Sequence, residues 1–251
     1  MTVTQPVLRA RRVVTTRAGG VSAPPYDSFN LGDHVGDDPA AVEANRRRLA
    51  SVIGLPYERL VWMEQIHSRN VTVVDGPVRG PVPATDALVT REPGLALVTL
   101  SADCVPVLLS DEEAGVIAAV HAGRIGARVG IVPRVLDTMT ELGARPERIG
   151  AFLGPAASGR RYEVPASMQA DVEAHLPGSA TRTVAGTPAL DLRAGLRRQL
   201  LEHGVTAVAE DPRCTIEDPT LFSHRRQAPT GRVAAVIWLE AGPDPAAGGG
   251  R

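Results

Sequence analysis

The chain has 251 residues, of which 43% are hydrophobic and 22% are charged, and its formal net charge is −1. This size and composition fit one globular domain, and the dispersed charges lack the basic stretch expected of a nucleic-acid-binding protein. All 27 basic residues are arginines, which excludes a phosphate-loop lysine and Schiff-base catalysis but leaves a side chain that binds phosphate bidentately.

We expect no signal peptide at the N-terminus and no membrane-spanning segment. Residues 1–5 lack the apolar core of a signal peptide, and no apolar run approaches the roughly 18 residues that span a bilayer. We therefore expect a cytoplasmic protein with no membrane contact, in which Cys104 is a free thiol rather than half of a disulfide with Cys214. One domain is expected over 1–241, followed by a disordered tail at 242–251.

Apolar runs bounded by Pro, Gly, Asp or Glu predict a mixed sheet. The strands are expected, in chain order, at 13–16, 60–63, 71–74, 87–89, 95–100, 105–109, 116–120, 149–153, 205–209 and 233–239. The fold class is therefore α+β, a mixed α/β fold with a central mixed sheet flanked by helices.

Helical periodicity and capping residues predict four helices. The first follows Asp38 as N-cap and stops at Gly54, and the last is capped by Asp191 and runs to about residue 203. Two more are expected at 128–142 and 165–176. Pro133 lies inside the first of these, so that helix either begins near it or bends there.

Two histidines and one cysteine lie at the edges of predicted strands. His67 connects the strands at 60–63 and 71–74, Cys104 precedes 105–109, and His121 follows 116–120. Two imidazoles and a thiolate form a known zinc site that leaves a fourth position open for water or substrate. The spacings of 37 and 17 residues match no zinc-finger pattern, so a buried structural cysteine and structural histidines remain the alternative.

Several sequence blocks occur in a fixed order over about residues 13–239. They lie at 16–22, 29–32, 36–39, 45–46, 65–67, 102–104, 120–123, 214–215 and 223–226. In these blocks the chain resembles the YfiH family, which is also named the multicopper polyphenol oxidase or laccase-domain family, the peptidoglycan editing factors, and the purine nucleoside phosphorylases related to human FAMIN.

The resemblance implies a single-domain zinc enzyme. Its members cleave adenosine, inosine, guanosine or methylthioadenosine with phosphate, and some deaminate adenosine. Carried to this chain, the metal ligands are His67, Cys104 and His121. The family usually continues the second histidine block with Trp-Arg, whereas this chain has Arg124-Ile125, so roles of those two family side chains do not transfer.

The resemblance also suggests residues around the metal. Asn30, Arg46 within the Asn45-Arg46 pair, and Arg225 are expected to bind substrate or phosphate. Asp103 is a candidate catalytic group, either for proton transfer or for orienting a metal ligand. Asp86 is a candidate of the same kind, although capping a turn is an equally good role for it.

Three other functions remain open. Cys104 with His121 as base would make a metal-free hydrolase, which leaves His67 without a role. A copper polyphenol oxidase needs several clustered sites, and six histidines and two cysteines are few for them. A zinc-stabilised binding protein for cell-wall precursor quality control would need a fourth protein ligand, for which His34 and His224 are candidates. The preferred prediction is a monomeric or homodimeric zinc enzyme that binds a purine nucleoside and phosphate.

Overall fold

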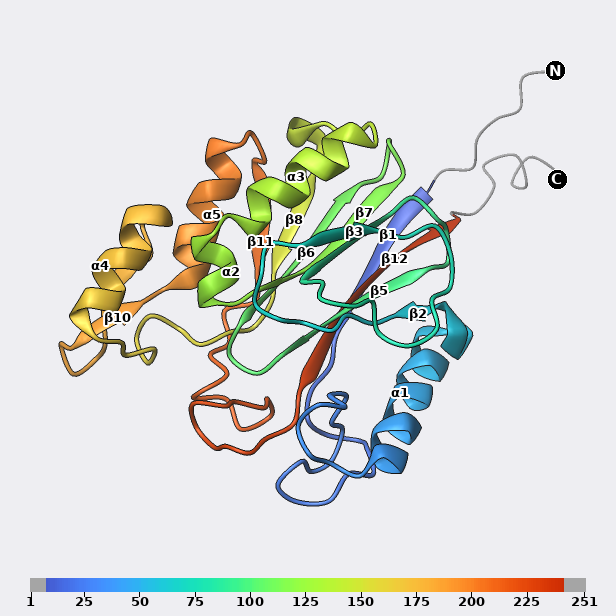
Figure 1. Cartoon of the computed structure of the whole chain (residues 1–251), viewed down its shortest axis with the longest axis horizontal. Coiled ribbons are helices and arrows are strands. Elements are labelled where there is room, and N and C mark those ends of the chain that lie inside the picture. Colours follow the sequence, from blue (N-terminus) through green and yellow to red (C-terminus); the bar gives the residue numbers. More distant parts are fainter. Residues whose placement is uncertain (1–7, 242–251) are drawn as a thin grey trace, which may run out of the picture.

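The computed structural model describes residues 8–241, in which a long run of consecutive strands is followed by mixed helices and strands (Figure 1). The expected mixed α/β class is confirmed. The strands, however, form a four-stranded sheet, a six-stranded sheet and a two-stranded hairpin instead of one central sheet. The tail expected at 242–251 lies outside the described residues.

The four-stranded sheet joins the two ends of the described chain. Its order is β1 (Leu8–Val14), β12 (Val233–Ala241), β5 (Ala96–Ser101) and β2 (Leu60–Val61). Strand β12 pairs antiparallel with both β1 and β5, and β2 is parallel to β5. Helix α1 (Pro39–Ile53) covers the outer face of this sheet (Figure 1), where an apolar cluster includes Leu31, Leu49, Trp62, Val98 and Val236.

The six-stranded sheet has the order β11 (Ala207–Glu210), β8 (Gly150–Leu153), β6 (Val105–Asp111), β7 (Val116–Ala122), β4 (Ala87–Thr90) and β3 (Val71–Val73). One face packs on the four-stranded sheet, and this contact includes Leu88, Leu97, Leu108, Ile117 and Ile237. The other face packs on helices α3 (Ile131–Glu141) and α5 (Leu192–Glu202). Because both faces are covered, β4 and β7 are buried along their whole length.

Local sequence signals set most helix ends. The Asp38 side chain accepts a hydrogen bond from the Ala40 N–H at 2.9 Å, and α1 ends at Gly54 with φ of 72°. Asp191 caps α5 in the same way through the Ala194 N–H. These two capping predictions are confirmed.

The helix expected at 128–142 is α3 (Ile131–Glu141), which begins near Pro133, one of the two alternatives that the sequence left open. The short helix α2 (Arg124–Arg128) precedes it and ends before Gly130, which has φ of 82°. Pro133 therefore falls in the first turn of α3, where its missing N–H leaves no bond unmade. The remaining elements are α4 (Ala166–His175), the hairpin of β9 (Ala180–Arg182) and β10 (Pro188–Leu190), and the 3-10 turns Tyr57–Arg59 and Pro146–Arg148.

The short hairpin and the 3-10 turns were not predicted, because segments of three residues are too short to show a hydrophobic period. Within residues 8–241, every helix is too short or too polar to traverse a bilayer.

Candidate metal centre

Three chain segments bring His67, Cys104 and His121 together. His67 lies on the connection between β2 and β3, Cys104 directly precedes β6, and His121 lies in β7. The antiparallel pairing of β6 and β7 sets Pro106 opposite His121, which places the preceding Cys104 next to that histidine. One ligand atom from each of the three residues lies within 4.8 Å of the other two.

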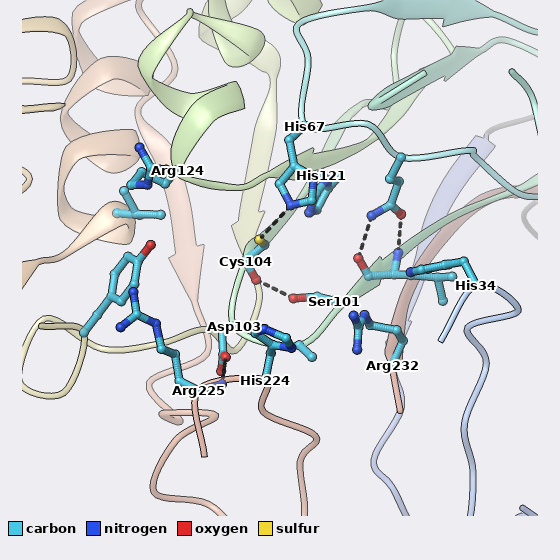
Figure 2. Close-up of a pocket in the computed structure, with 15 residues that line it drawn as sticks. His34, His67, Ser101, Asp103, Cys104, His121, Arg124, His224, Arg225 and Arg232 are labelled. Atoms are coloured by element: carbon cyan, nitrogen blue, oxygen red, sulfur yellow. Dashed lines mark hydrogen bonds between the residues drawn. The ribbon is translucent and has the colours of Figure 1, made fainter. Parts of the chain in front are cut away.

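The donor atoms face one another (Figure 2). The Cys104 Sγ atom is 3.9 Å from His67 Nε2, and the two imidazole rings meet edge to face with their centroids 4.7 Å apart. His67 is exposed, Cys104 is partly buried and His121 is buried. The donor set is thus open to solvent on the His67 side and closed on the His121 side.

Asp86, at the start of β4, orients two of these three residues. Its carboxylate is fully buried and accepts the His121 Nδ1–H at 2.9 Å, which turns the other ring nitrogen toward the cluster. It also accepts the backbone N–H groups of Ile66, His67 and Ser68 and the Ser68 hydroxyl. One carboxylate therefore fixes both the His121 ring and the loop that carries His67. Of the two aspartates singled out in the sequence, Asp86 is the one that bonds to both His121 and the His67 backbone.

The backbone around the cluster is strained and close-packed. His67 and Asp103 have positive φ angles of 61° and 96°, which non-glycine residues rarely adopt outside sites that hold them there. A Cβ atom on Gly123 would lie 2.9 Å from Cys104 Sγ and 2.9 Å from His67 Cδ2. The glycine after His121-Ala122 is therefore required by the approach of the donor side chains.

The groups of the cluster shift one another's protonation. Burial raises the pKa of the Cys104 thiol, but the adjacent His121 and His67 outweigh burial and lower that pKa to about 6. Burial lowers the pKa of His121, but Cys104 and Asp86 outweigh it and raise that pKa to about 9. Cys104 is thus predisposed to be a thiolate, the form that binds a metal ion.

The cluster lies at the base of a pocket with a volume of about 340 Å³. This volume is at the lower end of the range of small-molecule sites. Figure 2 shows its arginine, aspartate and other histidine side chains around the Cys104 thiol: Arg124, Arg225, Arg232, Asp103, His34 and His224. The two histidines considered as a fourth ligand line the pocket but do not join the three-residue donor cluster.

Asp103 and Arg225 both line the pocket, and a hydrogen bond joins the Asp103 side chain to the Arg225 backbone. The Asp103 carboxylate accepts the Thr215 hydroxyl at 2.6 Å and the Arg225 backbone N–H at 2.7 Å. The Arg225 guanidinium lies over the Tyr162 ring at 4.7 Å. With both oxygens engaged, Asp103 holds the loop of Arg225 against the Cys104 segment, which is a positioning contact.

Asn30 and Arg46 do not line this pocket. Asn30 is fully buried, and its side chain bonds Gly32, Asp37 and the Arg232 N–H. The Arg46 guanidinium stacks on Trp62 at 4.0 Å, donates to the Leu31 carbonyl and pairs with Asp33. Their contacts hold the 30–33 loop against α1 and β2, so direct contact with a ligand in this pocket is not supported for either residue.

From the sequence alone, no role is assigned to five polar residues that line the pocket: Gln65, Ser101, Arg124, Tyr162 and Arg232. The Gln65 amide bonds both the N–H and the C=O of Leu100, which ties the His67 loop to β5. No short motif marks Arg232, which precedes β12 and meets the pocket only through the tertiary fold.

Comparison with known proteins identifies the family of the chain. The sequence model of the family described as "Multi-copper polyphenol oxidoreductase laccase" matches residues 11–240. A protein of Mycobacterium tuberculosis named purine nucleoside phosphorylase is 62% identical over 233 residues, covering 93% of each chain. One of Corynebacterium glutamicum with the same description is 64% identical over 231 residues, covering 91% of this chain and 94% of the other.

Solved structures have the same fold. YlmD from Geobacillus stearothermophilus superposes with a TM-score of 0.87 at 35% identity and covers 94% of both chains. The YfiH protein of Bacillus licheniformis gives a TM-score of 0.86 at 30% identity, covering 91% of this chain and 92% of that one. From the family match over residues 11–240 and these whole-length similarities, the chain belongs to the multi-copper polyphenol oxidoreductase laccase family, which includes the YfiH proteins.

Proposed function

We propose that this protein is a zinc-dependent purine nucleoside phosphorylase that cleaves adenosine, inosine, guanosine or methylthioadenosine with phosphate. The observation that carries the proposal is the donor triangle of His67, Cys104 and His121 at the base of an arginine-lined pocket. The purine nucleoside phosphorylase names of relatives at 62–64% identity support the same reaction. Nucleosides and phosphate are cytoplasmic metabolites, so we place the enzyme, as monomer or homodimer, in that compartment.

The three donors fit zinc. Two neutral imidazoles and one thiolate match zinc's preference for nitrogen and sulfur, and three protein ligands leave the open position of a catalytic site. Within residues 8–241 no other group of three or more metal-binding side chains lies together, whereas multicopper oxidation needs several such groups. Zinc bound here would supply a Lewis acid able to stabilise negative charge or to lower the pKa of water.

The protein side chains would bind and orient the reactants. Arginine side chains and backbone N–H groups would hold the phosphate and orient one of its oxygens toward C1′ of the ribose. During the reaction the bond from phosphate oxygen to C1′ forms and the C1′–N9 bond breaks, with its electron pair going to the purine. The proton that phosphate loses goes through solvent to the purine.

Two other activities share this site. Deamination of adenosine is a second candidate, because the same donor set would activate a water molecule. A metal-free Cys-His hydrolase is favoured by one contact, since the Asp86–His121 hydrogen bond resembles the orienting pair of a catalytic triad. The hydrolase gives His67, which lies close to Cys104, no role. It also predicts responses to a metal chelator and to iodoacetamide that are opposite to those of the zinc enzyme.

The experiment uses untagged protein, its metal content and its turnover with and without phosphate. We expect about one zinc per chain, purine release that requires phosphate, and loss of activity on chelation with recovery on adding zinc. Iodoacetamide should react slowly with Cys104 in the zinc-loaded protein and quickly after chelation. Activity that resists the chelator and is abolished quickly by iodoacetamide would establish the hydrolase. Ammonia release from adenosine measures deamination in the same preparation.

A further inference from the structure

The pocket carries an excess of positive charge. Arg124, Arg225 and Arg232 line it, and Asp103 is its only carboxylate among the described residues. Both oxygens of Asp103 already accept hydrogen bonds, from Thr215 and from the Arg225 backbone. Three arginines therefore face the pocket against one carboxylate, and this excess of positive charge favours an anionic ligand.

Arg232 is the arginine whose position the fold fixes most tightly. Its backbone N–H donates to Asn30 Oδ1 at 2.8 Å, and its Nη1 donates to the carbonyls of Thr230 and Gly231 at 2.9 and 3.0 Å. A Cβ atom on Gly32 would lie 2.7 Å from Arg232 Cγ, so the glycine makes room for the arginine stem. Within residues 8–241 these are the bonds that the Arg232 side chain makes, and they leave its Nε and Nη2 groups free to donate.

The environment of Arg232 also favours an incoming anion. Burial lowers the pKa of its guanidinium, and this is partly offset by the negative charges of Cys104 and Asp103. A guanidinium in a partly desolvated position gains more from a bidentate anion than one in water does. Phosphate is an anion that matches its planar fork.

Arg225 is suited to a different part of the substrate. It is exposed, its Nη1 donates to the Glu163 carbonyl at 3.2 Å, and its guanidinium stacks on Tyr162. In Figure 2, Arg225 and Arg124 lie on one side of the Cys104 thiol, and Arg232 and His34 lie on the other. A flat guanidinium beside an aromatic ring suits a flat purine.

We propose that Arg232 binds the attacking phosphate and that the purine occupies the opposite side of the pocket, near Arg225 and Tyr162. This inference rests on the proposed phosphorolysis. A nucleophile and its leaving group approach and leave C1′ from opposite faces, so phosphate and purine must bind on opposite sides of the ribose. The two arginine-bearing sides of the pocket provide this arrangement.

The test compares three zinc-loaded variants: Arg232→Gln, Arg225→Gln, and Arg91→Gln at an exposed position outside the pocket. Losing a charge-assisted bond costs roughly 10- to 100-fold, so Arg232→Gln should raise the KM for phosphate by about that factor and change the nucleoside KM by less than about threefold. Arg225→Gln should raise the nucleoside KM more than the phosphate KM, and Arg91→Gln should change neither. An unchanged phosphate KM in Arg232→Gln overturns the inference.

Two further measurements do not depend on a KM. Calorimetric titration of inorganic phosphate into zinc-loaded protein should give a Kd at least about tenfold weaker for Arg232→Gln than for the parent. Added guanidinium ion should restore part of the phosphate-dependent rate of Arg232→Ala. The same treatment should restore none of that rate in Arg225→Ala. If the parent releases no purine from any of the four nucleosides, the proposed function fails. The phosphate titration still tests Arg232, and equal Kd values there refute its role.

Discussion

Asp86→Asn tests whether one buried carboxylate positions the metal ligands. The Asp86 carboxylate accepts two N–H groups at Oδ1, from His121 and His67, and two N–H groups and a hydroxyl at Oδ2. An asparagine replaces one of these acceptors with an NH₂ group. Whichever way the amide turns, two buried N–H donors lose their acceptor.

The magnitude follows from those two donors. An unsatisfied buried donor costs about 1–3 kcal/mol, so the free energy of unfolding should fall by about 2–6 kcal/mol. Loss of the carboxylate that orients a metal-bound histidine typically weakens metal binding about 10- to 100-fold. We would measure zinc affinity by competition with a chromogenic chelator, and stability by urea unfolding of the metal-free protein.

Asp111→Asn is the matched control. Asp111 is also fully buried, and it accepts backbone N–H groups and the Arg148 guanidinium. It lies at the far end of β6 from Cys104, about 23 Å away at 3.3 Å per residue. The control should lose comparable stability and keep its zinc affinity. Parental zinc affinity in Asp86→Asn, or an equal loss of affinity in both variants, would refute the positioning role.

Three further predictions concern single side chains. Gly123→Ala should weaken zinc binding by about tenfold or more, because the added methyl group would meet the Cys104 and His67 side chains. Gly76→Ala is the control and should leave zinc binding unchanged, because no atom lies within 4 Å of its added methyl group. Chelator competition measures the zinc affinity of both variants. Burial opposes ionisation of Asp111, but its hydrogen bonds and Arg148 outweigh burial and lower its pKa. Its contribution to stability should thus be complete above the unfolded pKa of about 3.9 and decline as pH falls through the lower folded pKa, so urea unfolding of Asp111→Asn should show a shallower acid limb. Arg46→Lys should lower the free energy of unfolding by about 1–3 kcal/mol, through loss of the Trp62 stacking and the bond to Leu31, and leave the phosphate KM unchanged. A phosphate KM raised about tenfold in Arg46→Lys would instead make Arg46 the phosphate residue.

The sequence by itself indicated where the three donor residues lie along the chain. Cys104 directly precedes one predicted apolar strand, His121 directly follows another, and His67 lies on the connection between two more. Strand ends are where a sheet presents side chains to a cleft. The ends of α1 were also determined by local sequence. The Asp38 side chain bonds an N–H of the first helical turn, and Gly54 adopts the positive φ angle that ends the helix. Such features depend on neighbours in sequence and can be derived before the fold is known.

Only the tertiary structure decided which charges face the pocket. Arg46 belongs to a sequence block and Arg232 to none, yet Arg232 lines the pocket while Arg46 is turned onto Trp62. The Asp86–His121 bond joins residues 35 positions apart, through the pairing of β4 with β7. The division of the strands into two sheets depends in the same way on which apolar faces meet. These contacts are long-range, and no local hydrophobic period or cap encodes which partner a polar side chain will find.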